Sequence, residues 1–265
     1  MLPRLFILSG AGLDKESGIN TFRDTGGTWD KFDLNEVCNI RTWAQNYEKV
    51  HSFYNERRMQ LGNVEPNAAH HFIAEMQKKY GKDRVINITA NVSDLLERAG
   101  VEDVLHIHGE LTKVVTDYTT PDCDSKDIGY AAYDYEKDRI DSRTFELNAK
   151  PDVIFFGEMA PAYEKMNSLL RGAGAVRPQD TVVVVGTQLS VVDYVGWFFS
   201  TNPYPYKIMI DPAIPEYDPE DSEYMPSNGY SEMTMAMPII DRKIPFGASR
   251  GFELVREDIE KRMDL

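Results

Sequence analysis

The chain has 265 residues, of which 42% are hydrophobic and 27% are charged, a composition typical of a globular protein with one large core. Its formal charge of −14 repels phosphate backbones, so no nucleic acid is expected as a partner; the charge favours basic, lysine-bearing proteins or simply keeps the chain soluble. Two cysteines are too few for a disulfide framework or a four-thiolate zinc site, which predicts a reducing, cytoplasmic setting.

The first predicted element is a strand that runs into a glycine turn. Residues 5–8 form an apolar run that is too short for a signal peptide or a membrane span, and Gly10 and Gly12 follow it directly. A strand, a glycine turn and a polar helix start are typical of a doubly wound fold around a nucleotide, because glycine lets backbone N–H groups approach a pyrophosphate. The third glycine of the usual dinucleotide motif is missing, since position 15 is lysine, and a simple tight turn is the alternative.

Later elements alternate between helices and strands. A helix is predicted over 66–81, because apolar residues recur there at helical spacing and Gly81 suits its C-terminal cap. Four compact apolar runs bounded by turn residues predict central strands covered on both faces: 84–90, 151–157, 180–186 and 206–211. The alternation predicts an α/β fold, a Rossmann-like doubly wound parallel sheet.

Two stretches interrupt this rhythm. Residues 31–65 look helical with an aromatic face, and residues 112–149 are acidic and irregular. We expect 31–65 and 112–149 to pack together as a small inserted domain over the edge of the sheet. The large Rossmann-like domain is then formed by the remaining segments: 1–30, 66–111 and 150–265.

A pair of histidines offers chemistry at the end of a strand. His106 and His108 are two residues apart, so on a strand they share one face, and a metal pair with Glu110 is one option. His108, directly before a glycine, better suits a general base. Three further histidines fall on predicted helices and are expected to be structural: His51, His70 and His71.

Two other features could hold a ligand. Tyr54 and Arg57 are three residues apart on a predicted helix, so they point the same way, and a guanidinium beside a phenol can bind a small carboxylate. A solvated arginine on the helix surface is the alternative, and on these residues alone it is favoured. Asp211 ends a strand and could accept a hydrogen bond from a ribose hydroxyl, although an aspartate before Pro212 is equally well explained as a turn former.

Taken together, these pieces resemble the sirtuins, NAD-dependent protein lysine deacylases. The first block is similar to the family's Gly-Ala-Gly-x-Ser-x-x-Ser-Gly-Ile-Pro-x-Phe-Arg. Six blocks follow the family's order: GAGLDKESGINTFRDTGGTW (10–29), PNAAHHF (66–72), TANVSDLLERAG (89–100), HIHGEL (106–111), KPDVIFFGEMAP (150–161) and VVVVGTQLSV (182–191). The stretch FYNERRMQLGNVEPNAAH (53–70) further resembles a bacterial subclass whose Tyr-x-x-Arg pair prefers succinylated or malonylated lysine.

The resemblance implies a role for each matching residue. His108 is the general base that activates a ribose hydroxyl, and Asn91 positions ribose and water. The expected NAD-binding set is Gly10, Ala11, Gly12, Phe22, Arg23, Thr89, Asn91, Ser93, Gly186, Thr187 and Asp211, with Ala11, Phe22 and Arg23 on the nicotinamide side. Phe156, Gly157 and Glu158 offer backbone to an acyl-lysine peptide, and Tyr54 and Arg57 read its acyl group. The acyl oxygen attacks the ribose, nicotinamide leaves, and the acyl group ends on ADP-ribose.

Three departures from the family pattern bear on this expectation. The paired Cys-x-x-Cys motifs are missing, so we expect no zinc. Ala90 replaces a glutamine that contacts ribose, and Ser93 replaces an aspartate that helps to seat the carboxamide, although a local shift would let the adjacent Asp94 partly replace that aspartate. These two changes predict slow or differently gated nicotinamide cleavage. An NAD glycohydrolase or ADP-ribosyltransferase, and a non-catalytic NAD or ADP-ribose sensor, are the alternatives. Because Asn91 and His108 are kept, we expect tuned catalysis rather than none.

Overall fold

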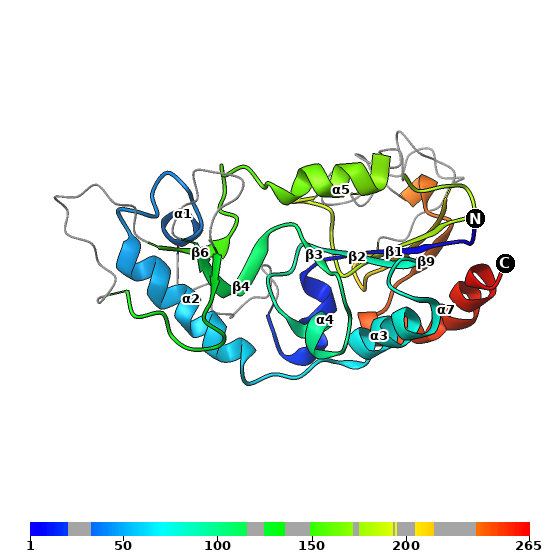
Figure 1. The fold of residues 1–265 in the computed structure, drawn as a ribbon, viewed down its shortest axis with the longest axis horizontal. Coiled ribbons are helices and arrows are strands. Elements are labelled where there is room, and N and C mark those ends of the chain that lie inside the picture. The colour runs from blue at the N-terminus through cyan, green and yellow to red at the C-terminus, as the bar shows by residue number, and fades with distance from the viewer. Residues whose placement is uncertain are drawn as a thin grey trace.

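The computed structural model describes residues 1–20, 33–115, 125–135, 149–171, 175–192, 194, 205–214 and 237–265. These ranges contain two sheets, and the larger sheet lies toward the end of the molecule that carries both termini (Figure 1). In the part of the chain that the structure describes, each helix is too short or too polar to span a bilayer.

The larger sheet has six strands, all parallel. They are β1 (Leu5–Ser9), β2 (Val85–Thr89), β3 (Leu105–His106), β7 (Thr181–Val185), β8 (Tyr206–Ile210) and β9 (Arg242–Ile244). Their order is β3-β2-β1-β7-β8-β9, so the chain builds outward in one direction from β1 and then in the other direction from β7. This is the order of a doubly wound Rossmann-like fold, which confirms the predicted fold class. In such folds ligands bind where the order reverses, at the carboxyl ends of the two central strands.

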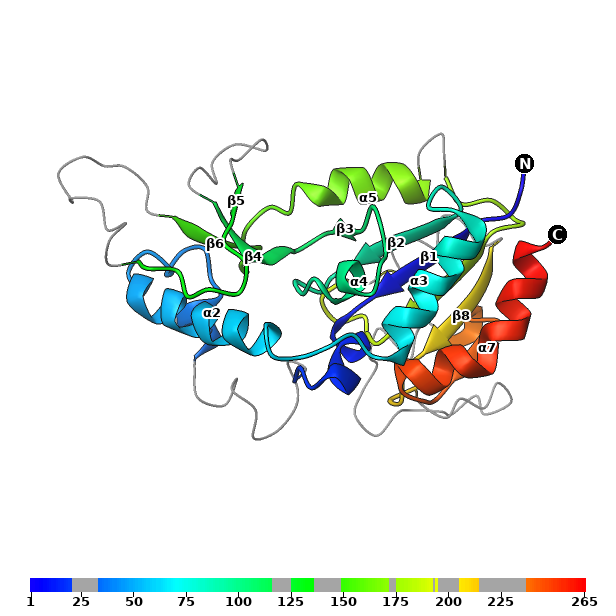
Figure 2. The ribbon, with the colours of Figure 1, turned by 60° about the horizontal axis from the view of Figure 1, so that its bottom comes forward.

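Helices cover both faces of this sheet. α3 (Ala68–Tyr80) and α7 (Ala248–Met263) lie on one face, and α5 (Ala162–Arg171) lies on the other (Figures 1 and 2). In β1, Leu5 and Ile7 join the core under α3 and α7, whereas Phe6 and Leu8 join the core under α5. Successive strand residues face opposite sides, so a strand covered twice must be apolar at every position, which explains the uninterrupted runs in the sequence.

The predicted helix over 66–81 is confirmed as α3. The side chain of Asn67 accepts hydrogen bonds from the first turn, and Gly81 follows the last helical residue with a φ of 90°. The shorter helices in the described ranges are η1 (Ala11–Leu13), η2 (Lys15–Ser17), α1 (Leu34–Val37), α4 (Leu95–Arg98) and η5 (Met237–Ile239).

A second, antiparallel sheet lies at the end of the molecule away from the termini (Figure 2). Its strands are β4 (Gly109–Val115), β5 (Ser125–Asp127) and β6 (Lys150–Val153), in the order β5-β4-β6, and α2 (Tyr47–Leu61) shares a core with β4 and β6. The prediction that residues 151–157 form a central strand of the parallel sheet is therefore wrong. That run is apolar because Val153 and Phe155 pack against Tyr54 of α2. The division of the chain into two domains stays a prediction.

Polar side chains of α2 fasten this helix to the chain around the smaller sheet. Asn55 donates to the carbonyl of Tyr133 over 3.0 Å and accepts from its N–H over 2.8 Å. Arg58 is fully buried and donates to the carbonyl of Leu111 and to Asn55, each over 2.7 Å. Buried backbone groups cost free energy when unpaired, so these bonds stabilise the described part of the module.

Candidate active site

Two glycine turns cross where the order of the parallel sheet reverses. Gly10 follows β1, Gly186 follows β7, and the N–H of Gly12 donates to the carbonyl of Gly186 over 2.8 Å. A Cβ on Gly12 would lie 2.6 Å from the Cα of Gly186, and Gly186 itself has a φ of 64°. Neither position accepts a side chain without strain, so the glycines are explained by the crossing of two backbones. The crossing leaves Ala11 partly exposed at the carboxyl edge of the sheet.

Asn91 is fixed by three hydrogen bonds just beyond β2. Its side-chain Nδ2 donates to the carbonyl of Gly10 over 3.0 Å, and its N–H donates to Oγ1 of Thr89 over 3.0 Å. Its carbonyl accepts from Nδ1 of His106 over 2.9 Å. The residue is 8% exposed, and these bonds leave Oδ1 as the side-chain atom that can accept from a ligand.

His108 lies between β3 and β4 with its ring nitrogens in different roles. Nδ1 is 3.3 Å from the carbonyl of Ala90, and because a carbonyl can only accept, Nδ1 carries the hydrogen. Nε2 then accepts from the hydroxyl of Tyr163 over 2.9 Å. Burial lowers the pKa of His108 below its ordinary value, so the imidazole is neutral at pH 7. A neutral imidazole with Nε2 unprotonated is the form that a general base requires. Tyr163 was not found from the sequence, where nothing but its position after the 150–161 block marks it.

His106 and His108 do not share a metal position. His106 faces two acceptors, the carbonyl of Asn91 and the carboxylate of Glu97, which lies 2.8 Å from Nε2. Burial acts to lower the pKa of His106, but the hydrogen bond and charge of Glu97 raise it above its ordinary value. The described residues contain no cluster of three His, Cys, Asp or Glu side chains suited to a metal ion. The metal-pair alternative therefore has no support from these two side chains.

A buried hydrogen-bond chain around Asp14 supports the glycine turn, and sequence reasoning missed it. Asp14 is 4% exposed and accepts from Oγ of Ser93 over 2.7 Å and from Nε2 of His70 over 3.1 Å. Nδ1 of His70 accepts from the N–H of Asn67 over 3.2 Å, which places the imidazole hydrogen on Nε2. Asn67 in turn donates to the carbonyl of Leu13 over 2.8 Å. His70 thus links α3 to the turn after β1.

Tyr54 and Arg57 lie together on α2 in an aromatic core. The ring of Tyr54 stacks on Phe155 with 5.7 Å between centroids, and its hydroxyl lies 3.3 Å from Sγ of Cys38. The guanidinium of Arg57 lies over the ring of Phe53, 5.0 Å from its centroid, and burial lowers the pKa of Arg57. The structure therefore places the phenol beside Phe155, next to the segment expected to bind a peptide, and the guanidinium over Phe53 of the same helix, while their binding of a carboxylate stays a prediction.

The segment expected to bind a peptide pairs with residues 38–40 on one edge. The N–H of Phe156 donates to Cys38 over 2.7 Å, and the carbonyl of Phe156 accepts from Ile40 over 3.2 Å. Glu158 turns its carboxylate back onto the same segment and accepts a backbone hydrogen bond over 2.8 Å. The N–H of Glu158 donates to the carbonyl of Phe155 over 3.0 Å and Gly157 has a φ of 82°, so residues 155–158 form a turn, and the addition of a peptide strand here stays a prediction.

Thr187 and Asp211 lie at the carboxyl ends of β7 and β8. Oγ1 of Thr187 accepts from the N–H of Leu189 over 3.1 Å, which leaves its hydroxyl hydrogen to be donated. Oδ1 of Asp211 accepts from the N–H of Ala213 over 2.8 Å, an arrangement that favours the turn-forming interpretation of this residue. Burial raises the pKa of Asp211. Phe22 and Arg23 of the expected NAD-binding set lie outside the described ranges, as does Cys123, the second of the two cysteines.

These observations fit a dinucleotide at the carboxyl edge of β1, β2 and β7. Gly10 is in direct contact there with Asn91 and with the turn at Gly186. His108 is hydrogen-bonded to the carbonyl of Ala90, the neighbour of Asn91. The edge thus combines glycine backbone that a ligand can approach, an amide oxygen that is fixed in place as an acceptor, and a neutral base. Doubly wound sheets bind nucleotides at this position.

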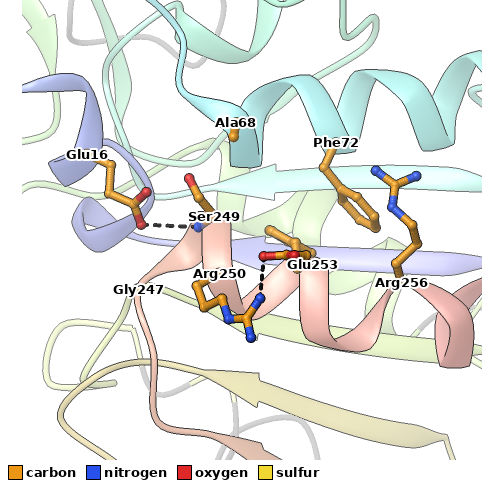
Figure 3. A pocket seen from close by; sticks show the side chains of 9 residues that line it. Glu16, Ala68, Phe72, Gly247, Ser249, Arg250, Glu253 and Arg256 are labelled. Atoms are coloured by element: carbon orange, nitrogen blue, oxygen red, sulfur yellow. Dashed lines mark hydrogen bonds and ion pairs between the residues drawn. The ribbon is translucent and has the colours of Figure 1, made fainter.

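A pocket of about 650 Å³ lies elsewhere, between α3 and α7 (Figure 3). Its charged side chains bind one another and the backbone: Glu16 accepts from the N–H of Ser249 over 3.1 Å, and Arg250 pairs with Glu253 over 2.6 Å. None of the predicted site residues lines it, and its charges are already paired, so it is not the candidate site.

Comparison with known proteins agrees with this geometry. NAD-dependent protein deacylases of Helicobacter hepaticus and Helicobacter pylori are 43% and 37% identical to the chain over 215 and 240 residues. These alignments cover 72% and 89% of this chain, and 77% and 95% of the relatives. Among solved structures, a mutant Sir2 homologue in complex with ADP-ribose has a TM-score of 0.73 at 27% identity and covers 99% of this chain and 94% of that one. A Sir2 homologue in complex with NAD has a TM-score of 0.72 at 27% identity, and the match covers 98% of this chain and 90% of the homologue.

The family model described as Sir2 matches residues 10–193. This span includes both glycine turns, Asn91, the His108 imidazole and the smaller sheet. The chain belongs to the Sir2 family.

Proposed function

We propose that the chain removes acyl groups from lysine side chains of proteins in a reaction that consumes NAD. The names of the relatives, NAD-dependent protein deacylases, support this activity, as do the Sir2 homologues solved with NAD and with ADP-ribose. The observation in this chain that carries the proposal is the neutral His108 imidazole, held by Ala90 next to the anchored Asn91.

The residues of this chain have distinct tasks in the proposed reaction. NAD, when bound, supplies the ribose carbon that the acyl oxygen attacks and the nicotinamide that leaves. His108 accepts a proton at Nε2 from a ribose hydroxyl, and the carbonyl of Ala90 holds the hydrogen on Nδ1 meanwhile. Asn91 orients ribose or water through Oδ1, because Gly10 and Thr89 prevent it from turning away. Tyr163 must release Nε2 before His108 can act.

The substrate is proposed to be an acyl-lysine peptide that adds as a strand beside residues 156–158. The acyl group would then enter the aromatic core beside Phe155, where Tyr54 and Arg57 lie. A succinyl or malonyl group brings a carboxylate that a partly buried guanidinium can pair with, so we propose that acidic acyl groups are preferred over acetyl.

Further properties follow from composition and the described residues. We propose a cytoplasmic protein with no membrane partner, because two cysteines suit a reducing compartment. We propose that it acts on proteins and has no nucleic acid partner, because its formal charge of −14 repels phosphate backbones. We also propose that it carries no structural zinc. Cys38 is buried against Tyr54, and burial raises the pKa of its thiol, whereas zinc requires thiolate.

A second candidate is an NAD glycohydrolase or ADP-ribosyltransferase on the same fold. Ala90 favours it, because this residue has only a methyl group, which packs into the core under α5, where the resemblance expects an amide. A binding protein without catalysis is the third candidate.

Release of nicotinamide from NAD separates the three. We expect release by the purified chain only when an acyl-lysine peptide is present. Release without peptide would instead show a glycohydrolase, and saturable NAD binding without release would show a sensor.

A further inference from the structure

Two positions differ together from the sirtuin pattern. Asp14 stands where the Gly-Ala-Gly-x-Ser block has serine, and Ser93 stands where the family has aspartate. Taken alone, Ser93 removes a carboxylate from the site, and Asp14 adds one to a buried turn. Each change by itself predicts a weakened site.

The structure brings these two positions into direct contact. Oγ of Ser93 donates to Oδ2 of Asp14 over 2.7 Å, although the residues are 79 apart in the sequence. Both side chains are buried, because Ser93 is 7% exposed and Asp14 is 4% exposed. The contact joins one hydroxyl to one carboxylate, and exchanging the two residues conserves that combination.

We propose that Asp14 and Ser93 have exchanged roles, and that Asp14 is the positioning residue that supplies the carboxylate of the NAD site from the glycine turn. This rests on the proposed function. The hydrogen bond ties the turn after Gly10 to the loop after Asn91, the two segments that we assign to NAD.

The other neighbour of Asp14, His70, requires a hydrogen-bond acceptor at this position. Nε2 of His70 donates to Oδ1, because the N–H of Asn67 fixes the hydrogen of the imidazole on Nε2. Asp14 therefore accepts from two donors at once. With Ser93 as the partner, a serine at position 14 would satisfy one of these donors at most, whereas with an aspartate at position 93 it could donate to that aspartate and still accept from His70.

The exchange makes a specific prediction about reversal. Ser93→Asp alone places two carboxylates against each other in a buried contact, where like charges repel. Asp14→Ser alone leaves a buried donor without its acceptor. Only the double variant Asp14→Ser/Ser93→Asp restores one hydroxyl and one carboxylate.

A double-mutant cycle tests the proposal with the wild type, both single variants and the double variant. The measurements are the midpoint of thermal unfolding, the dissociation constant of NAD by calorimetry, and the KM values for NAD and for acyl peptide. We expect each single variant to bind NAD about tenfold or more weakly and to unfold a few degrees lower, since a buried unpaired polar group is costly. The double variant is expected to recover both within about threefold and about 2 °C. The KM for peptide should change little, because the pair adjoins the glycine turn rather than the 155–158 segment.

Glu16→Gln provides the matched control, because Glu16 lies in the same turn but its carboxylate caps α7 at Ser249. It should leave NAD affinity unchanged, and Glu16→Gln/Ser93→Asp should bind NAD as weakly as Ser93→Asp alone. Additive losses in the Asp14/Ser93 double variant would overturn the exchange. The exchange would also be overturned if the two substitutions were coupled in thermal unfolding but all four proteins bound NAD equally well. The pair would then stabilise the fold without acting on the NAD site. If the wild type binds NAD but releases no nicotinamide, the proposed deacylase fails, while calorimetry and unfolding still decide the exchange.

Discussion

The hydroxyl of Tyr163 donates to Nε2 of His108 over 2.9 Å, so the lone pair that the proposed base needs is occupied in this structure. Tyr163 lies in the first turn of α5, five residues after Glu158. The same helix that covers one face of the sheet thus connects the proposed peptide-binding segment to the proposed base.

Tyr163→Phe should change the pH dependence of kcat/KM. Burial lowers the pKa of His108, and a donor to Nε2 further favours the neutral form, so its removal raises that pKa toward 6.5. Activity requires the neutral base and is lost as pH falls through the pKa, so the acid limb should move to higher pH in the variant. Tyr80→Phe, which loses an exposed hydroxyl bond to Asp264, should leave the limb in place. An acid limb that coincides with that of the wild type would show that Tyr163 does not act on His108.

Arg57→Met should reduce kcat/KM on a succinyl-lysine peptide by about tenfold or more and spare the acetyl-lysine peptide. Hydrogen bonds to a charged group contribute about 1.5–3 kcal/mol each, and acetyl offers no charge to pair with. Arg58→Met is the matched control, because Arg58 binds Leu111 and Asn55 and supports the fold. It should lower the unfolding temperature and affect both substrates alike. Equal loss on the two substrates for Arg57→Met would mean that Arg57 does not read the acyl group.

His51 should make the protein less stable in acid. Nε2 of His51 donates to the carbonyl of Ala149 over 2.9 Å, and burial lowers the pKa of this imidazole to about 4. A histidine in the unfolded chain titrates near 6.5, so its contribution is complete above pH 6.5 and is lost as pH falls toward 4, by about 1.4 kcal/mol for each pH unit. His51→Gln should flatten the pH dependence of the unfolding free energy in this interval, whereas exposed His71→Gln should not. Parallel curves for wild type and His51→Gln would contradict the assignment.

Purified protein should contain no stoichiometric zinc, and a chelator should leave its unfolding temperature unchanged. Side chains of α2 fasten the described part of the smaller module, through Asn55 and Arg58. Elemental analysis that finds one tightly held zinc per chain would overturn this prediction and require ligands beyond Cys38.

The sequence predicted the parallel sheet well because strands covered on both faces carry apolar side chains on both sides, as residues 5–8 and 182–185 do. The same rule failed for residues 151–157. An apolar run reports burial but not the partner strand, and here the partner is β4 rather than a parallel neighbour.

The candidate site was predicted in part. Asn91 and His108 stand in motifs that match the family. In the structure Asn91 keeps Oδ1 as an acceptor, and His108 carries its hydrogen on Nδ1, so Nε2 can act as a base. The Asp14 network was missed, because its bonds to His70 and Ser93 span 56 and 79 residues and no local pattern reports them. The two departures from the family pattern were the available signal, but only when taken together.

The central claim is that the acyl group passes from lysine to ADP-ribose with His108 as the base. The most direct measurement is a single-turnover reaction of the chain with NAD and a succinyl-lysine peptide carrying an isotope-labelled succinyl group, followed by mass spectrometry of the products. We predict that the label appears on ADP-ribose in amounts equal to the nicotinamide released. His108→Ala should lower the rate about 10²- to 10⁴-fold while NAD still binds. Label recovered only as free succinate from the first time point, beside unmodified ADP-ribose, or full turnover by His108→Ala, would contradict the account.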